Sequence, residues 1–171
     1  MDAIVAVYSD WGIGDGGTQP VVLKADRVHF REVTADAAVI VGRKTLSDFP
    51  GGRPLKNRTN IVVTRQDISI PEAIVVHSTD EALAAASAQK RTIVIGGASI
   101  YEQFFPYTDR VFLTKIFCRP DSSRFFHNLD EDIFWNCVQE GPVLEEDGIS
   151  YQFCIYERSD DGCLKTVKRL K

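Results

Sequence analysis

Short runs of apolar and β-branched residues recur along the chain and alternate with amphipathic segments. Strands are predicted at residues 3–8, 37–42, 60–64, 73–78, 92–97, 110–117, 133–139 and 149–158. Several of these runs are apolar throughout, which is typical of strands buried on both faces of a parallel sheet. The last run alternates, with Ile149, Tyr151 and Phe153 on one side. This alternation favours an antiparallel strand.

Helices are expected between these runs, at residues 23–34, 44–49, 79–90 and 98–107. The third opens with a capping box, because Ser78 precedes Glu81 by three positions. The alternation of strands and helices predicts an α/β domain with a mostly parallel sheet. The helix-free last third predicts antiparallel strands added at one edge. Ligands of such sheets bind beyond the carboxyl ends of the strands.

The first predicted helix carries a carboxylate on its apolar face. At about 100° per residue, Leu23, Phe30 and Val33 cluster on one side, and Asp26 falls among them. A buried carboxylate is costly unless it is paired or hydrogen-bonded. Three interpretations remain open: a core residue with a local partner, a residue on a solvated face if the helical phase differs, or a pocket residue that holds a polar ligand.

A second polar residue lies among apolar ones in the sixth predicted strand, residues 110–117. Alternation along residues 110–117 places Thr114 on the same face as Phe112 and Ile116. A hydroxyl group there could hydrogen-bond a carboxylate and fix its orientation. A lone carboxylate in an apolar pocket can bind an edge with two adjacent N–H donors, or hold a proton with a raised pKa. We interpret the three histidines as surface or structural residues.

The sequence GIGDGG, residues 12–17, matches the G-x-G-x-x-G pattern and follows a predicted strand. A dinucleotide-binding fingerprint also requires a helix that begins at once, so that its amides meet the pyrophosphate. Pro20 interrupts any such helix. We therefore interpret this stretch as a flexible loop beside a site, with the dinucleotide fingerprint as the less favoured alternative.

Two other glycine-containing turns are better placed to bind an anion. VIVGRKT runs from a predicted strand through Gly42 into a helix, and IVIGGAS does so through Gly96 and Gly97. Each turn puts backbone N–H groups and a positive helix end beyond a strand, and Arg43 and Lys44 add positive charge to the first. The two turns would suit a ligand with two separated phosphate groups. The alternative, that both are ordinary strand-to-helix turns, remains open.

Composition narrows the class of protein. The chain has 171 residues, 44% of them hydrophobic, which suits one compact domain, and its net charge of −4 argues against a nucleic-acid binder. Cys118, Cys137, Cys154 and Cys163 form no C-x-x-C pair, and no metal-ligand spacing is present. No signal peptide or run of about 18 apolar residues is visible. We expect a cytoplasmic monomer with reduced thiols, no metal, and no membrane or nucleic-acid partner.

At this level of detail the chain resembles the dihydrofolate reductase family. The segments that carry the resemblance are IVAVYSDWGIG, LKADRVHF, VIVGRKT, GRPLKNRTNIVVT, IVIGGASIYEQF and VFLTKI. The resemblance implies a central eight-stranded sheet with four flanking helices over residues 1–158. Residues 159–171 are polar and basic, and we interpret them as a solvated tail. It implies NADPH-dependent reduction of 7,8-dihydrofolate to tetrahydrofolate, with hydride transfer to pterin C6 and protonation of N5.

The resemblance also implies roles for single residues. Asp26 matches the family's acidic site residue, which binds the pterin 2-amino group and N3 and promotes protonation. Thr114 matches the threonine that supports it, and Arg58 matches the arginine that pairs with the glutamate tail of folate. The other implied substrate contacts are Ile4, Val5, Arg27, Phe30, Phe49, Leu55 and Ile95. The implied NADPH contacts are Ala6, Ile13, Gly42, Arg43, Lys44, Thr45, Thr64, Arg65, Ile95, Gly96, Gly97, Ala98, Ser99, Ile100 and Tyr101.

Two further features follow from the same resemblance. Arg43, Lys44 and Arg65 would favour the 2′-phosphate and therefore NADPH over NADH. The segment GIGDGG would begin the mobile loop that closes over the nicotinamide.

Three positions depart from the family pattern. Val21 stands where a tryptophan that holds a water near the pterin is usual. Arg27 replaces an apolar residue that faces the folate benzoyl group, and Lys24 stands where proline is common. Two alternatives also stay open, namely a riboflavin-pathway reductase of the same fold and a non-catalytic NADPH- or folate-binding module. Asp26 together with Thr114 and Arg58 favours the folate reductase.

Overall fold

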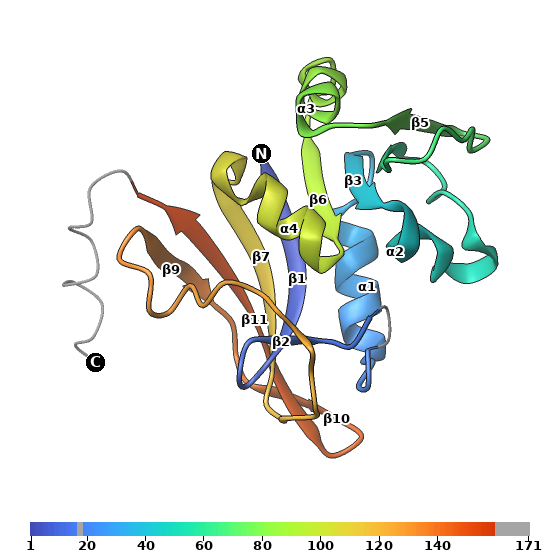
Figure 1. The fold of residues 1–171 in the computed structure, drawn as a ribbon. Helices are drawn as coiled ribbons and strands as arrows, with labels where there is room; N and C mark the ends of the chain where they lie inside the picture. The colour runs from blue at the N-terminus through green and yellow to red at the C-terminus, as the bar shows by residue number, and fades with distance from the viewer. Residues whose placement is uncertain (17–18, 160–171) are drawn as a thin grey trace.

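The computed structural model describes residues 1–16 and 19–159 and shows an α/β fold built on one large sheet (Figure 1). The strands of this sheet are β1 (Asp2–Tyr8), β3 (Ala38–Gly42), β4 (Thr59–Val63), β5 (Ala73–Val76), β6 (Thr92–Gly96), β7 (Arg110–Ile116), β9 (Trp135–Glu140), β10 (Leu144–Glu146) and β11 (Ile149–Arg158). Eight of them follow one another in the order β10-β11-β7-β1-β6-β3-β4-β5, and β9 pairs with β11.

The direction of the strands is the predicted one. Strands β1, β3, β4, β5, β6 and β7 are parallel to their neighbours within this group. β11 runs antiparallel to β7 and places Phe153 opposite Thr114, and β9 and β10 are antiparallel to β11. Each of the eight apolar runs forms a strand. The sequence did not indicate β10, which is too short for a periodic pattern to be visible.

Helices cover both faces of the sheet. They are α1 (Lys24–Val33), α2 (Arg43–Ser47), α3 (Thr79–Ser87) and α4 (Ala98–Phe104). Side chains of α3 and α4 pack in one core cluster with Val5, whereas side chains of α1 and α2 pack in a second with Ile4. Ile4 and Val5 are successive residues of β1, so their side chains point to opposite faces of the sheet. The α1–α2 face carries the carboxylate singled out in the sequence.

The helical phase predicted for α1 is correct. Leu23 is 2% exposed and packs beside Tyr8 and Ile116, and Phe30 and Val33 are half-buried against the second core cluster. The predicted cap of α3 is also present, since the Ser78 side chain accepts a hydrogen bond from the Glu81 amide at 3.1 Å.

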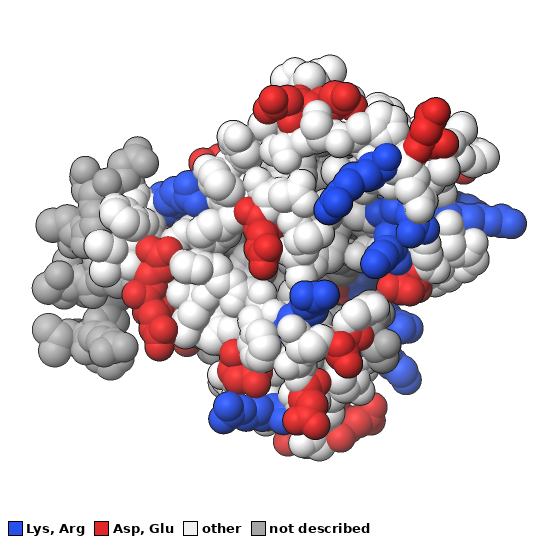
Figure 2. All heavy atoms as spheres, in the orientation of Figure 1, with Lys and Arg blue, Asp and Glu red and all other residues white. Residues whose placement is uncertain are grey.

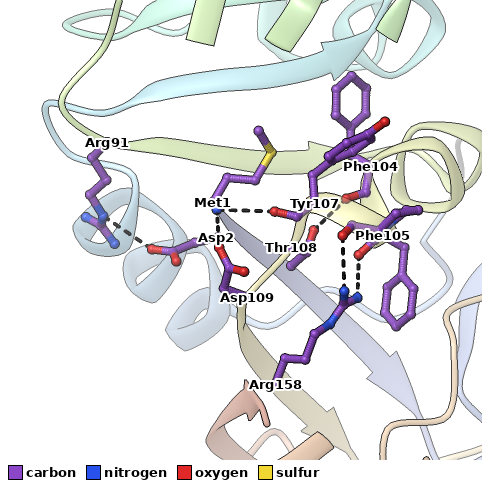
Figure 3. Close-up of polar contacts among 10 residues, drawn as sticks. Met1, Asp2, Arg91, Phe104, Phe105, Tyr107, Thr108, Asp109 and Arg158 are labelled. Carbon is purple, nitrogen blue, oxygen red and sulfur yellow. Dashed lines mark hydrogen bonds and ion pairs between the residues drawn. The ribbon is translucent and has the colours of Figure 1, made fainter. Parts of the chain in front are cut away.

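The amino ends of the parallel strands are fastened by a group of polar contacts (Figure 3). The Met1 ammonium group donates to an Asp109 carboxylate oxygen at 2.6 Å and to the Tyr107 carbonyl at 3.2 Å. Arg158 donates to the Phe105 carbonyl at 2.7 Å and stacks over the Phe105 ring. The start of β1 and the end of β11 are thereby tied to the segment that leads into β7.

The GIGDGG stretch does not open a helix. Gly12–Gly14 forms the short strand β2, which pairs antiparallel with β8 (Arg124–Phe125). The next helix, α1, begins only at Lys24, so rejection of the dinucleotide fingerprint was correct. Gly17 and Thr18 lie outside the described residues, as does the predicted tail from residue 160 onward.

Candidate active site

Asp26 lies in the first turn of α1 and points toward β7. The Thr114 hydroxyl donates a hydrogen bond of 2.6 Å to its Oδ1 atom. Thr114 is completely buried, whereas Asp26 is half-buried. The interpretation in which Asp26 stands on a solvated face is therefore wrong. A short hydrogen bond to a buried hydroxyl fixes the orientation of the carboxyl group and leaves Oδ2 for another partner.

The surroundings of Asp26 favour its protonated form. Burial raises the pKa of the Asp26 carboxyl, while the hydrogen bond from Thr114 and the charge of His29 lower it. His29 stands one helical turn further along α1, and its ring centroid is 4.2 Å from that of Phe153. Burial lowers the pKa of His29, against the effect of Asp26 and Glu32. The carboxyl group therefore binds a proton more readily than an exposed aspartate does.

Apolar side chains gather on the same side of the sheet. Ile4 and Ile95 belong to the buried part of the α1–α2 cluster, and Phe30, Phe49 and Leu55 are its half-buried members. These five predicted substrate contacts are brought together. Val5, a sixth, is not, because its side chain packs in the cluster on the opposite face. Only the backbone of Val5 could reach a ligand beside Asp26.

Arg58 is held in place at the end of α1. Its Nε donates to Thr34 Oγ1 at 2.9 Å, and its two Nη atoms donate to the carbonyls of Lys56 at 2.7 Å and Arg31 at 3.0 Å. A guanidinium group has five N–H donors, so two remain for a ligand. Three anchoring bonds keep the group at a fixed angle, which suits recognition of a carboxylate.

The two glycine turns that were predicted to bind an anion lie against each other. Gly42 is the N-cap residue of α2 and Gly97 that of α4, and neither has a side-chain cap. A Cβ atom at Gly97 would stand 2.8 Å from Thr45 Oγ1, and one at Gly42 would stand 3.1 Å from the Ile100 side chain. Each turn therefore packs on the helix of the other and leaves its first amides for a ligand.

Tyr101 ties this region to the central strand. Its hydroxyl donates to the Ile4 carbonyl at 2.7 Å, and its ring meets that of Phe126 edge-on at 5.1 Å. Burial raises the pKa of the Tyr101 hydroxyl, so the group stays neutral and keeps its proton to donate. The β6–α4 turn is thus fixed relative to β1.

The remaining predicted cofactor residues surround these turns. Arg43 is half-exposed, and Lys44, Arg65 and Ser99 are exposed. Figure 2 shows Lys and Arg side chains gathered over the part of the molecule that carries α2. The other predicted contacts are Ala6, Ile13 and Ala98, which are half-buried, and Thr64, which is buried. Ile13 packs in the cluster on the α3–α4 face.

Comparisons with known proteins agree with this geometry. A family model described as dihydrofolate reductase matches residues 1–158. The chain belongs to the dihydrofolate reductase family. It is 36% identical to a Bacillus subtilis dihydrofolate reductase over 162 residues, which cover 93% of this chain and 95% of the relative. It is 33% identical to a Rattus norvegicus dihydrofolate reductase over 184 residues, with 94% and 98% covered.

A solved structure of an Enterococcus faecalis dihydrofolate reductase, complexed with NADP(H) and RAB-propyl, superimposes with a TM-score of 0.83. It is 31% identical in sequence, and the match covers 93% of this chain and 96% of that one. The dihydrofolate reductase fold, with its mostly parallel sheet and antiparallel C-terminal strands, is therefore confirmed.

Two residues that depart from the dihydrofolate reductase pattern have different environments. Val21 is fastened by Tyr8, whose hydroxyl accepts from the Val21 amide at 3.1 Å and lies 3.3 Å from the Val21 carbonyl, to which it donates. Arg27 is exposed on α1, and no hydrogen bond or ion pair of its side chain is present among residues 1–16 and 19–159. The guanidinium group of Arg27 is thus available to a ligand.

The sequence did not indicate two neighbours of this candidate dihydrofolate reductase site, His29 and Tyr8. We interpreted His29 as a surface or structural residue, although its spacing of three residues from Asp26 places the two on one side of the helix, where each influences the pKa of the other. The two hydrogen bonds between the Tyr8 hydroxyl and the Val21 backbone are not indicated by any pattern in the sequence. In the part of the chain that the structure describes, no cluster of three or more His, Cys, Asp or Glu side chains is arranged to hold a metal ion, and no helix could span a membrane.

Proposed function

We propose that this chain reduces 7,8-dihydrofolate to 5,6,7,8-tetrahydrofolate with NADPH and so serves one-carbon metabolism. The observation that carries the proposal is the pair formed by Asp26 and Thr114. It puts a carboxyl group of raised pKa beside half-buried apolar side chains. Asp26 is the residue we assign to the 2-amino group and N3 of the pterin, where its second oxygen can accept a hydrogen bond.

The residues of the two glycine turns fit NADPH. Gly42 and Gly97 leave backbone amides for phosphate groups, because their helices have no side-chain cap. Arg43, Lys44 and Arg65, which are half-exposed or exposed, supply positive charge for the 2′-phosphate. When bound, NADPH supplies the hydride for pterin C6. The chain's own part is to orient the two ligands, exclude water and raise the proton affinity near N5 through Asp26.

Arg58 is the residue we assign to the glutamate tail of the substrate. Its anchored guanidinium group and two remaining N–H donors support this assignment. The riboflavin-pathway alternative calls for a phosphate-binding group in the substrate site, which the Asp26 carboxylate opposes. We further propose a cytoplasmic monomer, a setting that agrees with the free thiols of Cys118, Cys137 and Cys154.

The decisive experiment is a spectrophotometric assay of NADPH oxidation with dihydrofolate. NADH and the riboflavin-pathway intermediate serve as alternative reactants. Wild type is expected to oxidise NADPH only with dihydrofolate. Asp26→Asn is expected to retain NADPH affinity and lose about 100-fold or more of the rate at neutral pH, because its amide cannot supply a proton. Normal turnover by this variant, or turnover of the riboflavin intermediate instead, would contradict the proposal.

A further inference from the structure

The start of α1 is capped by a residue from the far end of the chain. The Glu146 carboxylate accepts hydrogen bonds from the Lys24 amide at 2.6 Å and from the Ala25 amide at 3.0 Å, one through each oxygen. Lys24 and Ala25 are the first two residues of the helix. Asp26 is the third and follows this pair of bonds directly.

Helix α1 has no local substitute for this cap. The first amides of a helix have no partner within it, and the N-cap residue, Leu23, provides no side-chain hydrogen bond. The first bond inside the helix runs from the Arg27 amide to the Leu23 carbonyl at 3.2 Å. A carboxylate at this end also interacts favourably with the helix dipole. Glu146 therefore provides the hydrogen-bond acceptors for the first two amides of the turn that contains Asp26.

Glu146 is itself held in one position. It is the last residue of β10 and pairs with Ile149 of β11 across a two-residue turn. Asp147 and Gly148 in that turn have φ values of 51° and 80°, as in the type I′ turns of tight hairpins. The hairpin lies at the same end of the molecule as the start of α1 (Figure 1). The tight turn fixes the position of the Glu146 backbone, from which its side chain reaches the start of α1.

The cap and the support of Asp26 belong to one structural unit. Thr114 of β7, which donates to Asp26, is paired with Phe153 of β11. The same strand β11 carries the hairpin that ends in Glu146. The neighbouring strands β7, β11 and β10 thus fasten the first turn of α1 at two points. One point is the Asp26 carboxyl group, and the other is the backbone just before it.

We propose that Glu146 is a positioning residue for Asp26. By capping the start of α1, it keeps the Asp26 carboxyl group at the place beside β7 where it meets the pterin. This inference rests on the proposed function of Asp26 and adds a residue to it. Loss of the cap leaves the Asp26 side chain tethered by Thr114 alone while the backbone beneath it opens.

The test compares Glu146→Ala with Glu145→Ala. Glu145 lies on the same strand and carries the same charge, but it is exposed and pairs with Ser150. The single-turnover rate of dihydrofolate reduction is measured well below the melting temperature and divided by the concentration of NADPH-binding sites. We expect Glu146→Ala to lose about 10-fold or more of this rate, with NADPH affinity unchanged. Glu145→Ala is expected to match wild type.

A double-mutant cycle separates positioning from general destabilisation. In an Asp26→Asn background, Glu146→Ala should cost no further rate, because the residue through which it acts is already lost. Lys24→Pro is compatible with the helix, because the first helical position accepts proline. This substitution removes one of the two N–H donors to Glu146, so it should reduce the effect of Glu146→Ala. An equal rate loss with and without Asp26, or no loss relative to Glu145→Ala, overturns the proposal.

A second readout does not depend on turnover. The ¹³C resonance of the Asp26 carboxyl group in the NADPH complex is expected to shift or broaden in Glu146→Ala and to stay unchanged in Glu145→Ala. If wild type fails to reduce dihydrofolate, the proposed function fails, and this resonance alone decides whether Glu146 positions Asp26. An unchanged resonance in Glu146→Ala overturns the inference.

Discussion

At the scale of single residues, the Asp26 carboxyl group combines partial burial with one short hydrogen bond. The sequence alone indicated both partners, because helical and strand periodicity fix which side chains share a face. It could not indicate the three bonds that hold Arg58, since two of the acceptors lie 24 and 27 residues earlier in the chain. Only the folded arrangement brings them together.

The pKa of Asp26 has a consequence for stability. Burial raises this pKa in the folded protein above the unfolded value of about 3.9. Ionisation therefore costs folded stability, and the cost grows as pH rises from the unfolded pKa through the folded one. Asp26→Asn, which cannot ionise, is expected to match wild type at low pH and to exceed it at neutral pH. Urea unfolding at both pH values checks this, with Glu145→Gln as a control for net charge.

Arg58 and Arg27 can be distinguished by the tail of the substrate. Arg58→Lys keeps the charge but loses the planar fork, so its affinity for dihydrofolate is expected to fall about 10-fold, as for loss of one charged hydrogen bond. Its affinity for dihydropteroate, which lacks the glutamate, should not change.

Arg27→Leu tests whether the exposed guanidinium group of Arg27 also contacts the glutamate tail of the substrate. Equal affinities of wild type and Arg27→Leu for both ligands would remove Arg27 from the substrate site.

At the scale of elements, the two glycine turns were recognised in the sequence as separate pieces. Their contact was not, because β3 and β6 are neighbours in the sheet but about 50 residues apart along the chain. The strands β2, β8 and β10 were missed since two or three residues carry no period. The long-range cap of α1 was missed for a similar reason, because a local sequence pattern cannot show a partner 121 or 122 residues away.

The contact between the turns makes Gly97 sensitive to substitution. Gly97→Ala would place its methyl group 2.8 Å from Thr45 Oγ1, so one of the two turns must move. We expect NADPH affinity to fall about 10-fold or more, as for a misplaced phosphate contact. Ser78→Ala is the control, because it removes the cap of α3 at a cost of about 1 kcal/mol without touching either turn. Fluorescence titration with NADPH should show unchanged affinity in this control.

At the scale of the whole molecule, the residues that we propose to bind NADPH come from both faces of the sheet and include residues of strands β1, β3 and β6. A ligand that joins these parts stabilises the folded state by mass action. NADPH at 100 times its dissociation constant should add about 2.7 kcal/mol, which raises the melting temperature by about 5–10 °C. Calorimetry measures this shift. It should shrink in Gly97→Ala, and an equal shift with NADH at the same concentration would contradict the proposed preference for NADPH.

The place of β1 in the sheet determines when the chain can fold during synthesis. This strand is made first, yet its two neighbours, β6 and β7, comprise residues 92–96 and 110–116. A nascent chain that ends before β6 therefore leaves both edges of an apolar strand unpaired, and one that ends before β7 leaves one edge unpaired. Such edges aggregate readily. The hydrogen bond of Asp26 with Thr114, and the cap that Glu146 forms on α1, can likewise form only after these later residues have been made. The carboxyl group to which we assign the pterin is thus among the first parts translated and among the last to reach its final geometry.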